Sequence, residues 1–264
     1  MKQQWLFLGR LGRRGIFTLD WLGGLFIFAV DALINCWRMP GFLNSLGIQT
    51  LTTYKRCALP VIFMLVPLGA MLGLQGLLVV QAFDLERLFS AQVVNALVRE
   101  MAPGFSALMV AMQAGAGMTA ELGTMSVRQE TYALETMGLP CNSFLGGPRI
   151  LATTVATALL CPIGAFAGIL GAFIYAVLIG GFPFNQFALH MGDLINLSDL
   201  WIAEIKCLVF GLLTGVICTE AGLRTPQKSA AQVGSSANRA VVRCVVLLVV
   251  CNYILNTAIY GLRG

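Results

Sequence analysis

The amino-acid sequence predicts an all-α membrane protein with an N-terminal interfacial helix, five transmembrane helices and a short surface helix between the second and the third. Of its 264 residues, 58% are hydrophobic and only 11% are charged, whereas a soluble domain carries roughly 25% charged residues. The apolar residues also gather in runs longer than the ~20 residues that a helix needs to cross a bilayer. Such a chain cannot cover itself with a polar surface, which excludes an ordinary soluble domain.

The N-terminal region, residues 1–54, is expected to lie in the membrane interface. Its apolar stretch over residues 21–30 is bounded by Asp20 and Asp31 and is too short to cross the bilayer. Basic residues upstream favour an amphipathic helix in the interface plane. A tilted extra span over residues 15–37 is the alternative. A cleaved signal peptide is not expected, because the acidic residues interrupt the apolar stretch.

Five apolar segments are expected to cross the membrane within a domain over residues 55–264. They cover residues 57–83, 91–118, 150–181, 200–222 and 244–262. The third exceeds the bilayer thickness, so we expect it to tilt or to kink at Pro162. Its Gly164, Gly168 and Ala172 form a row of small residues, which permits close contact with another helix.

The polar segment between the second and third spans is expected to form a helix on the membrane surface at about residues 119–137. Its apolar residues recur at helical spacing, and Gly138 and Pro140 end it. One interpretation is a contact surface for a separate subunit, and the other is a plain interfacial linker. Spacing alone favours neither.

The lysine and arginine residues are distributed asymmetrically over the predicted loops, which sets the expected orientation. The side with the N-terminus, the 119–149 loop and the 223–243 loop carries 13 of the 17 basic residues. The N-terminus is therefore expected in the cytoplasm and the C-terminus on the opposite side. An odd number of spans satisfies this arrangement.

The sequence offers little material for covalent or metal chemistry, so no catalytic and no metal-binding residue is expected. His190 is the single histidine, and the eight cysteines form no CxxC pair. The sequence contains no GxxxxGK[ST] loop, which would hold the phosphates of a nucleotide. Any ATP-driven work therefore requires a separate subunit.

Charged residues in or beside the predicted spans are the most informative positions, because a charge in a span is costly unless it is paired or hydrated. The second span contains Arg99 and Glu100, and the fourth contains Glu204 and Lys206, with Asp199 just before it. Residues two apart on a helix do not face each other, so Glu100 is expected to pair with Lys206 across helices. The alternatives are a functional polar cluster and charges that snorkel to the lipid headgroups.

Four short blocks carry a resemblance over most of the chain. They are Arg99-Glu-Met-Ala-Pro103, Ala120-Glu-Leu-Gly-Thr-Met125, Ala133-Leu-Glu-Thr-Met-Gly138 and Pro148-Arg-Ile-Leu-Ala152. In their residues, order and spacing they resemble the MlaE/YrbE permease family. The resemblance extends to Leu74-Gln-Gly76 in the first span and to Val209-Phe-Gly211 in the fourth.

The resemblance implies the permease subunit of an ABC transporter that moves phospholipids or other hydrophobic lipids between the inner and outer membranes. It implies a permease homodimer, two ATP-binding cassette ATPase subunits that hold ATP and Mg²⁺, and a periplasmic MCE-domain oligomer. This chain itself would hold no cofactor. It would lie in a bacterial inner membrane, with its C-terminus in the periplasm and a cytoplasmic coupling helix at residues 119–137. A scaffold that anchors a periplasmic lipid-binding assembly and a proton-coupled carrier remain as alternatives.

The resemblance also implies roles for three groups of residues. The lipid-facing group lies on one face of the first span: Leu72, Gln75, Val79 and Phe83. The intramembrane charge cluster is Arg99, Glu100, Asp199 and Lys206. The ATPase-coupling group is Glu121, Arg128, Gln129, Glu130 and Glu135.

The chain departs from the family pattern at three positions, Gln113, Tyr132 and Asn252. The first and the last are expected to remove a charge from a span, and Tyr132 to change the contact with the ATPase. None of the three is expected to touch the pair of Glu100 and Lys206.

Overall fold

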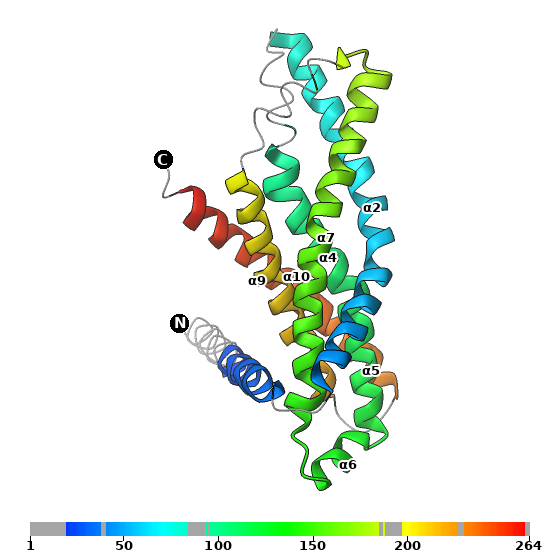
Figure 1. Ribbon diagram of the computed structural model, residues 1–264, viewed down its shortest axis with the longest axis vertical. Helices are drawn as coiled ribbons and strands as arrows, with labels where there is room; N and C mark the ends of the chain where they lie inside the picture. Colours follow the sequence, from blue (N-terminus) through cyan, green and yellow to red (C-terminus); the bar gives the residue numbers. More distant parts are fainter. Residues whose placement is uncertain are drawn as a thin grey trace, which may run out of the picture.

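The computed structural model describes residues 20–37, 41–83, 93, 95–184, 187, 197–225 and 230–261. Within these residues every regular element is a helix, as predicted, and α2 and α7 run side by side along the long axis (Figure 1). Residues 20–36 form the first described helix. The remaining elements, in which η denotes a π-helix, are α2 (Phe42–Phe83), η1 (Leu97–Met101), α4 (Ala102–Val110), η2 (Ala111–Gly115), α5 (Ala116–Val127), α6 (Glu130–Thr136), η3 (Asn142–Gly146), α7 (Gly147–Phe173), η4 (Ile174–Ile179), α9 (Leu197–Leu223) and α10 (Ala230–Tyr260). Residues 1–19 and His190 lie outside the described part.

Four helical segments among the described residues are long and apolar enough to cross a membrane. They are Phe42–Leu78, Asn142–Ile179, Ser198–Leu223 and Gln232–Ile259. These four correspond to the first, third, fourth and fifth expected spans. The chain is also helical throughout residues 95–127, where the second span was expected. This segment is not among the four candidate spans. Its Pro103, Gln113 and glycines make the segment less apolar than those four.

Helix α2 begins well before the charge-free run that predicted it. Lys55 and Arg56 lie inside this helix rather than at its beginning, because both residue types are good helix formers. Upstream of them Leu43, Ile48 and Leu51 are exposed. The first membrane helix therefore starts within the region expected to be interfacial.

The helix over residues 20–36 packs one face against the bundle and leaves the other exposed. Leu25, Phe28 and Ala32 are buried in a cluster with residues of α7, α9 and α10, whereas Phe26 and Ile27 are exposed. A helix that is apolar on both faces suits a position between protein and lipid. None of the four candidate spans includes it.

Small residues bring the backbones of α2 and α7 into direct contact. A Cβ atom added to Gly69 would lie 1.9 Å from the carbonyl oxygen of Gly168, and one added to Gly73 would lie 2.9 Å from that of Ala172. Gly168 and Ala172 belong to the row that was predicted to permit close contact. The prediction is confirmed, and α2 is the partner helix.

The segment over residues 119–137 is not the single surface helix that was expected. Helix α5 continues from the preceding helical segment and buries Leu122 and Ser126. Gln129 then adopts a φ of +60°, and only α6 forms a separate short helix at the end of the bundle (Figure 1). No glycine or proline marks this break in the sequence. The prediction, which used periodicity alone, therefore treated the two helices as one.

Candidate functional site

Lys206 is among the largest fully buried side chains of the described residues, and it lies among polar partners. Its Nζ is 3.0 Å from Glu100 Oε1 and donates to the Arg99 carbonyl oxygen, also at 3.0 Å. It donates further to Oδ1 of Asn256 on α10. The contact with Glu100 confirms the predicted pairing. Because the exposed fraction of Lys206 is 0%, this side chain does not snorkel to a surface.

Pro103 explains why a main-chain carbonyl takes part in this site. Proline has no backbone N–H, so it cannot donate to the carbonyl four residues earlier, which belongs to Arg99. The helix is π-helical at this point, over Leu97–Met101, and such irregular turns often accompany functional sites. The Lys206 ammonium supplies a donor to the Arg99 carbonyl from another helix.

Glu100 is held by two amide side chains of α10 as well as by Lys206. Its Oε2 accepts hydrogen bonds from Asn256 Nδ2 at 2.7 Å and from Asn252 Nδ2 at 3.4 Å. The expectation that Asn252 would not touch the ion pair was therefore wrong. An amide at this position adds a donor to the carboxylate, where an acidic residue would have added a second negative charge.

Arg99 and Asp199 form the second ion pair of the cluster. Arg99 Nη2 lies 2.7 Å from Asp199 Oδ2, and the Asp199 side chain is 5% exposed. The four charged residues together carry two positive and two negative charges, so the cluster is neutral overall. It joins the 95–127 helical segment to α9 and α10, toward the end of the bundle away from α6. Ion pairs and hydrogen bonds between helices can form and break without covalent change, so this cluster can hold the helices together without being a catalytic site.

The predicted lipid-facing residues of α2 do not all lie on one exposed face. Gln75 is exposed, but Leu72 packs against an apolar cluster that includes Leu97 and Ala172. The side chains of Val79 and Phe83 lie outside the described part. Met71 and Leu78 are 56% and 58% exposed. Met71, Gln75 and Leu78 lie at i, i+4 and i+7 and so share one face of the helix. The prediction chose Leu72 instead and missed this exposed face.

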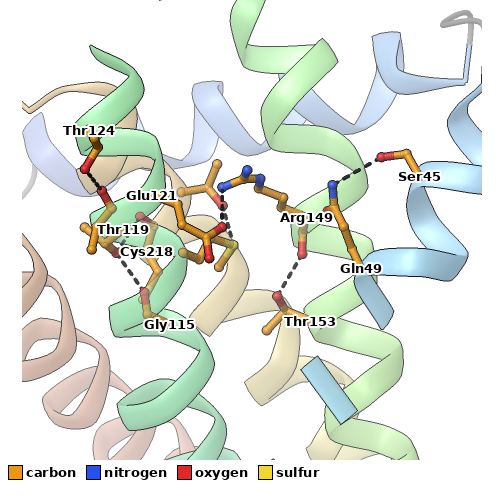
Figure 2. A network of polar contacts seen from close by, with 12 residues as sticks. Ser45, Gln49, Gly115, Thr119, Glu121, Thr124, Arg149, Thr153 and Cys218 are labelled. Carbon is orange, nitrogen blue, oxygen red and sulfur yellow. Dashed lines mark hydrogen bonds and ion pairs between the residues drawn. The ribbon is translucent and has the colours of Figure 1, made fainter. Parts of the chain in front are cut away.

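The predicted coupling residues lie at the opposite end of the bundle. Arg128, Gln129, Glu130 and Glu135 are all exposed, at or near α6. Glu121 belongs instead to α5, and Figure 2 shows it directed toward Arg149 of α7. Its carboxylate lies 3.6 Å from Arg149 Nη1 and 3.9 Å from Arg56 Nη1.

Cys141 connects α6 to the start of the candidate span Asn142–Ile179. Its Sγ donates to the carbonyl oxygen of Thr131 at 3.0 Å. Burial raises the pKa of the Cys141 thiol, so the thiol keeps the proton that this hydrogen bond requires. The contact fixes the base of α6, while most of its side chains remain exposed.

The sequence also matches a family of known proteins. A family model described as Permease MlaE matches residues 47–258. The chain belongs to the MlaE permease family. A probable ABC transporter permease protein of Rickettsia bellii is 29% identical over 246 residues, which cover 93% of this chain and 94% of the relative.

Two further relatives of this MlaE-family permease come from photosynthetic organisms. A probable ABC transporter permease protein of Synechocystis is 27% identical over 168 residues, or 64% of each chain. The chloroplastic Arabidopsis thaliana protein TRIGALACTOSYLDIACYLGLYCEROL 1 is 27% identical over 180 residues, which cover 68% of this chain and 51% of the relative. The similarity to ABC transporter permeases thus reaches beyond one bacterial genus.

Proposed function

We propose that this chain is the membrane permease of an ABC transporter that moves phospholipids or other hydrophobic lipids between the inner and outer membranes. The observation that carries the proposal is membership of the MlaE permease family over residues 47–258. ABC permeases work with separate ATPase subunits, which agrees with a sequence that contains no nucleotide-binding loop. The Arabidopsis relative is named after a glycerolipid, which supports a lipid as the cargo.

The proposed assembly is a permease homodimer with two ATPase subunits and a periplasmic MCE-domain oligomer. In it, the helical segment over residues 95–127 is the remaining span. This segment packs against α2, α7, α9 and α10, and it runs between the four apolar helices. Five spans agree with the asymmetry of the basic residues, with the N-terminus in the cytoplasm and the C-terminus in the periplasm.

Helix α6 is the proposed contact for the ATPase, because it exposes large side chains at the cytoplasmic end of this orientation. Tyr132 on this helix is 61% exposed, and Met137, directly after its last residue, is 73% exposed. Tyrosine and methionine are enriched in protein interfaces, and Glu130 and Glu135 beside them supply charges for the rim. The Tyr132 departure from the family pattern thus falls at the centre of the proposed contact.

Replacing Tyr132 and Met137 together by alanine is expected to reduce association with the ATPase at least tenfold, because truncation of buried interface anchors costs about 2 kcal/mol or more. The measurement is the amount of ATPase that co-purifies with the tagged permease. Thr136→Ala is the matched control, since Thr136 is exposed on the same helix. Equal recovery of the ATPase with the double variant and with wild type would show that α6 is not the contact.

ATP-dependent lipid transfer separates the proposed transporter from a membrane scaffold. The chain and its co-purified subunits are reconstituted in vesicles that contain a fluorescent phospholipid, and transfer to acceptor vesicles or to the MCE-domain protein is followed. We expect transfer or extraction that requires ATP hydrolysis. A scaffold would retain its partners but show the same transfer with ATP, with a non-hydrolysable analogue and without nucleotide.

A further inference from the structure

Two arginines border a pocket between α2, α5 and α7, at the end of the bundle that carries α6. The cavity has a volume of about 110 Å³, and Arg56, Glu121, Arg149 and Gln49 line its polar part. Figure 2 shows Arg149 between Glu121 on one side and Gln49 on the other. None of these residues takes part in the charge cluster around Lys206.

The polar groups of this pocket are incompletely satisfied by the protein. The two contacts of the guanidinium groups with Glu121 measure 3.6 and 3.9 Å, which is longer than a hydrogen bond. Arg149 Nη1 is buried and has no hydrogen-bond acceptor among the described residues. The buried Oε1 of Gln49 also lacks a partner there, but as an acceptor it requires a donor, such as a headgroup hydroxyl, rather than a phosphate oxygen. Buried polar atoms normally have partners, so the arrangement is suited to a polar ligand.

The charge of the pocket suits a singly charged anion. Arg56 and Arg149 contribute two positive charges and Glu121 contributes one negative charge, which leaves one positive charge. A phosphodiester carries one negative charge, and arginine side chains bind phosphate oxygens through paired, charge-assisted hydrogen bonds. Arg56 also lies directly against α5, because a Cβ atom added to Gly117 would be 2.4 Å from its Nη1.

The position of the pocket favours a lipid as the source of this phosphate. Arg56 directly precedes the charge-free run over residues 57–83, and Arg149 directly precedes the run over residues 150–181. Both arginines lie inside the candidate spans Phe42–Leu78 and Asn142–Ile179, at the points where the charge-free runs begin. We infer that these points lie at the level of the lipid headgroups. The rest of the lining consists of three apolar side chains and three threonines: Ala114, Met118, Ala152, Thr52, Thr53 and Thr153.

We propose that this pocket binds the phosphate of an anionic phospholipid headgroup, in the leaflet at the α6 end of the bundle. The two guanidinium groups hold the phosphate, and Glu121 competes with it for them. The site is separate from the lipid-facing residues proposed on α2, and it does not depend on the transport function. Glu121 lies on α5, and α6 follows α5 directly in the chain. Helix α5 therefore connects the proposed headgroup site with α6.

The test is a binding titration of the full chain, purified in detergent with any accompanying subunits, against short-chain phosphatidylglycerol. Arg56→Gln and Arg149→Gln are each expected to weaken binding about tenfold, the effect of losing one charge-assisted contact. Glu121→Gln is expected to tighten binding severalfold, because it removes the competing carboxylate. Gly117→Ala is expected to weaken binding, because its methyl group displaces Arg56. Arg239→Gln is the matched control, since Arg239 is exposed on α10 and bonds to Ser235.

Two competitors identify the ligand chemistry. Short-chain diacylglycerol, which lacks the phosphate, is expected not to compete, and inorganic phosphate is expected to compete only at much higher concentration than the lipid. Equal binding by wild type and both arginine variants would overturn the site. Competition by diacylglycerol would overturn the phosphate contact, and equal potency of inorganic phosphate would overturn the lipid as its source. The opposite signs expected for Glu121→Gln and Arg149→Gln separate ligand binding from a general loss of folding.

Discussion

Replacing Lys206 by leucine is expected to abolish the proposed ATP-driven lipid transfer and to lower the Tm of the protein. The substitution leaves Glu100 without its ammonium partner and removes the donor to the Arg99 carbonyl. Breaking a buried ion pair costs about 3–5 kcal/mol. We expect a loss near the lower limit, about 3 kcal/mol, because the Glu100 side chain is 37% exposed and solvent offsets part of the cost. Thermal unfolding in nanodiscs measures the stability, and vesicle transfer measures the activity.

A double variant separates the structural role of this pair from its role in transport. Replacing both Glu100 and Lys206 by leucine removes both charges, and such replacements are often neutral for stability. We expect the Tm to recover most of its loss while transport stays absent. Lys55→Leu is the matched control, since Lys55 is exposed on α2, and it should change neither readout. Recovery of transport together with the Tm would limit the ion pair to a structural role.

The exchanged pair tests whether the charges act through their contact. Glu100→Lys alone is expected to impair transport, because it places two ammonium groups together among the amides of α10. Adding Lys206→Glu restores an opposite-charge pair, and the Asn256 amide can then donate to a carboxylate on α9. We expect partial recovery of transport in the double exchange. No defect in the single Glu100→Lys variant would contradict a role for the cluster.

The sequence predicted the pair of Glu100 and Lys206 because a charge in an apolar run requires a partner. Helical spacing excluded Glu204 as that partner, and the pair then followed from the few charges that remained. The same reasoning could not predict Asn256, because a neutral amide in a span carries no such requirement. It lies 156 residues from Glu100 in the sequence, and only the packing of α10 brings the two together. The role of Asn252 was misjudged for the same reason.

Helix boundaries were predicted less well than helix existence. The start of α2 was placed at the charge-free run. Lysine and arginine, however, have helix propensities close to those of leucine and methionine, so a helix can continue through them. The break at Gln129 depends on a left-handed backbone conformation that non-glycine residues adopt rarely. Burial of Leu122 and Ser126 in the bundle holds α5 in line with the segment before it. The start of α2 therefore follows from helix propensity and the end of α5 from tertiary packing, and neither is visible in charge-free runs or in periodicity.

The row of small residues on the third span was recognised from the sequence, but its partner was not. Many helices carry glycines, and spacing does not say which of them meet. The structure pairs the row with Gly69 and Gly73 of α2. It also adds Gly171, where a Cβ atom would lie 2.0 Å from the Val66 carbonyl oxygen. This contact gives the second large effect that we expect from a single substitution.

Replacing Gly171 by alanine is expected to lower the Tm and the yield of folded protein in the membrane. The added methyl group meets backbone atoms of α2, which cannot rotate away as a flexible side chain could. The two helices must therefore separate, and overpacking of this kind costs about 1–3 kcal/mol or more. Membrane helices associate largely through such close packing of small residues. Thermal unfolding in nanodiscs and the recovered amount of monodisperse protein measure the effect.

Gly104→Ala is the matched control, because Gly104 lies inside α4 and a Cβ atom there meets nothing within 4 Å. Alanine is the better helix former by about 1 kcal/mol, so this variant should match or exceed the stability of the wild type. Both substitutions gain the same helix propensity, and only Gly171→Ala introduces a clash. The difference between their Tm values therefore isolates the contact of α2 with α7. Equal Tm values would mean that the two helices do not approach at Gly171, and the α2–α7 packing described above would be wrong.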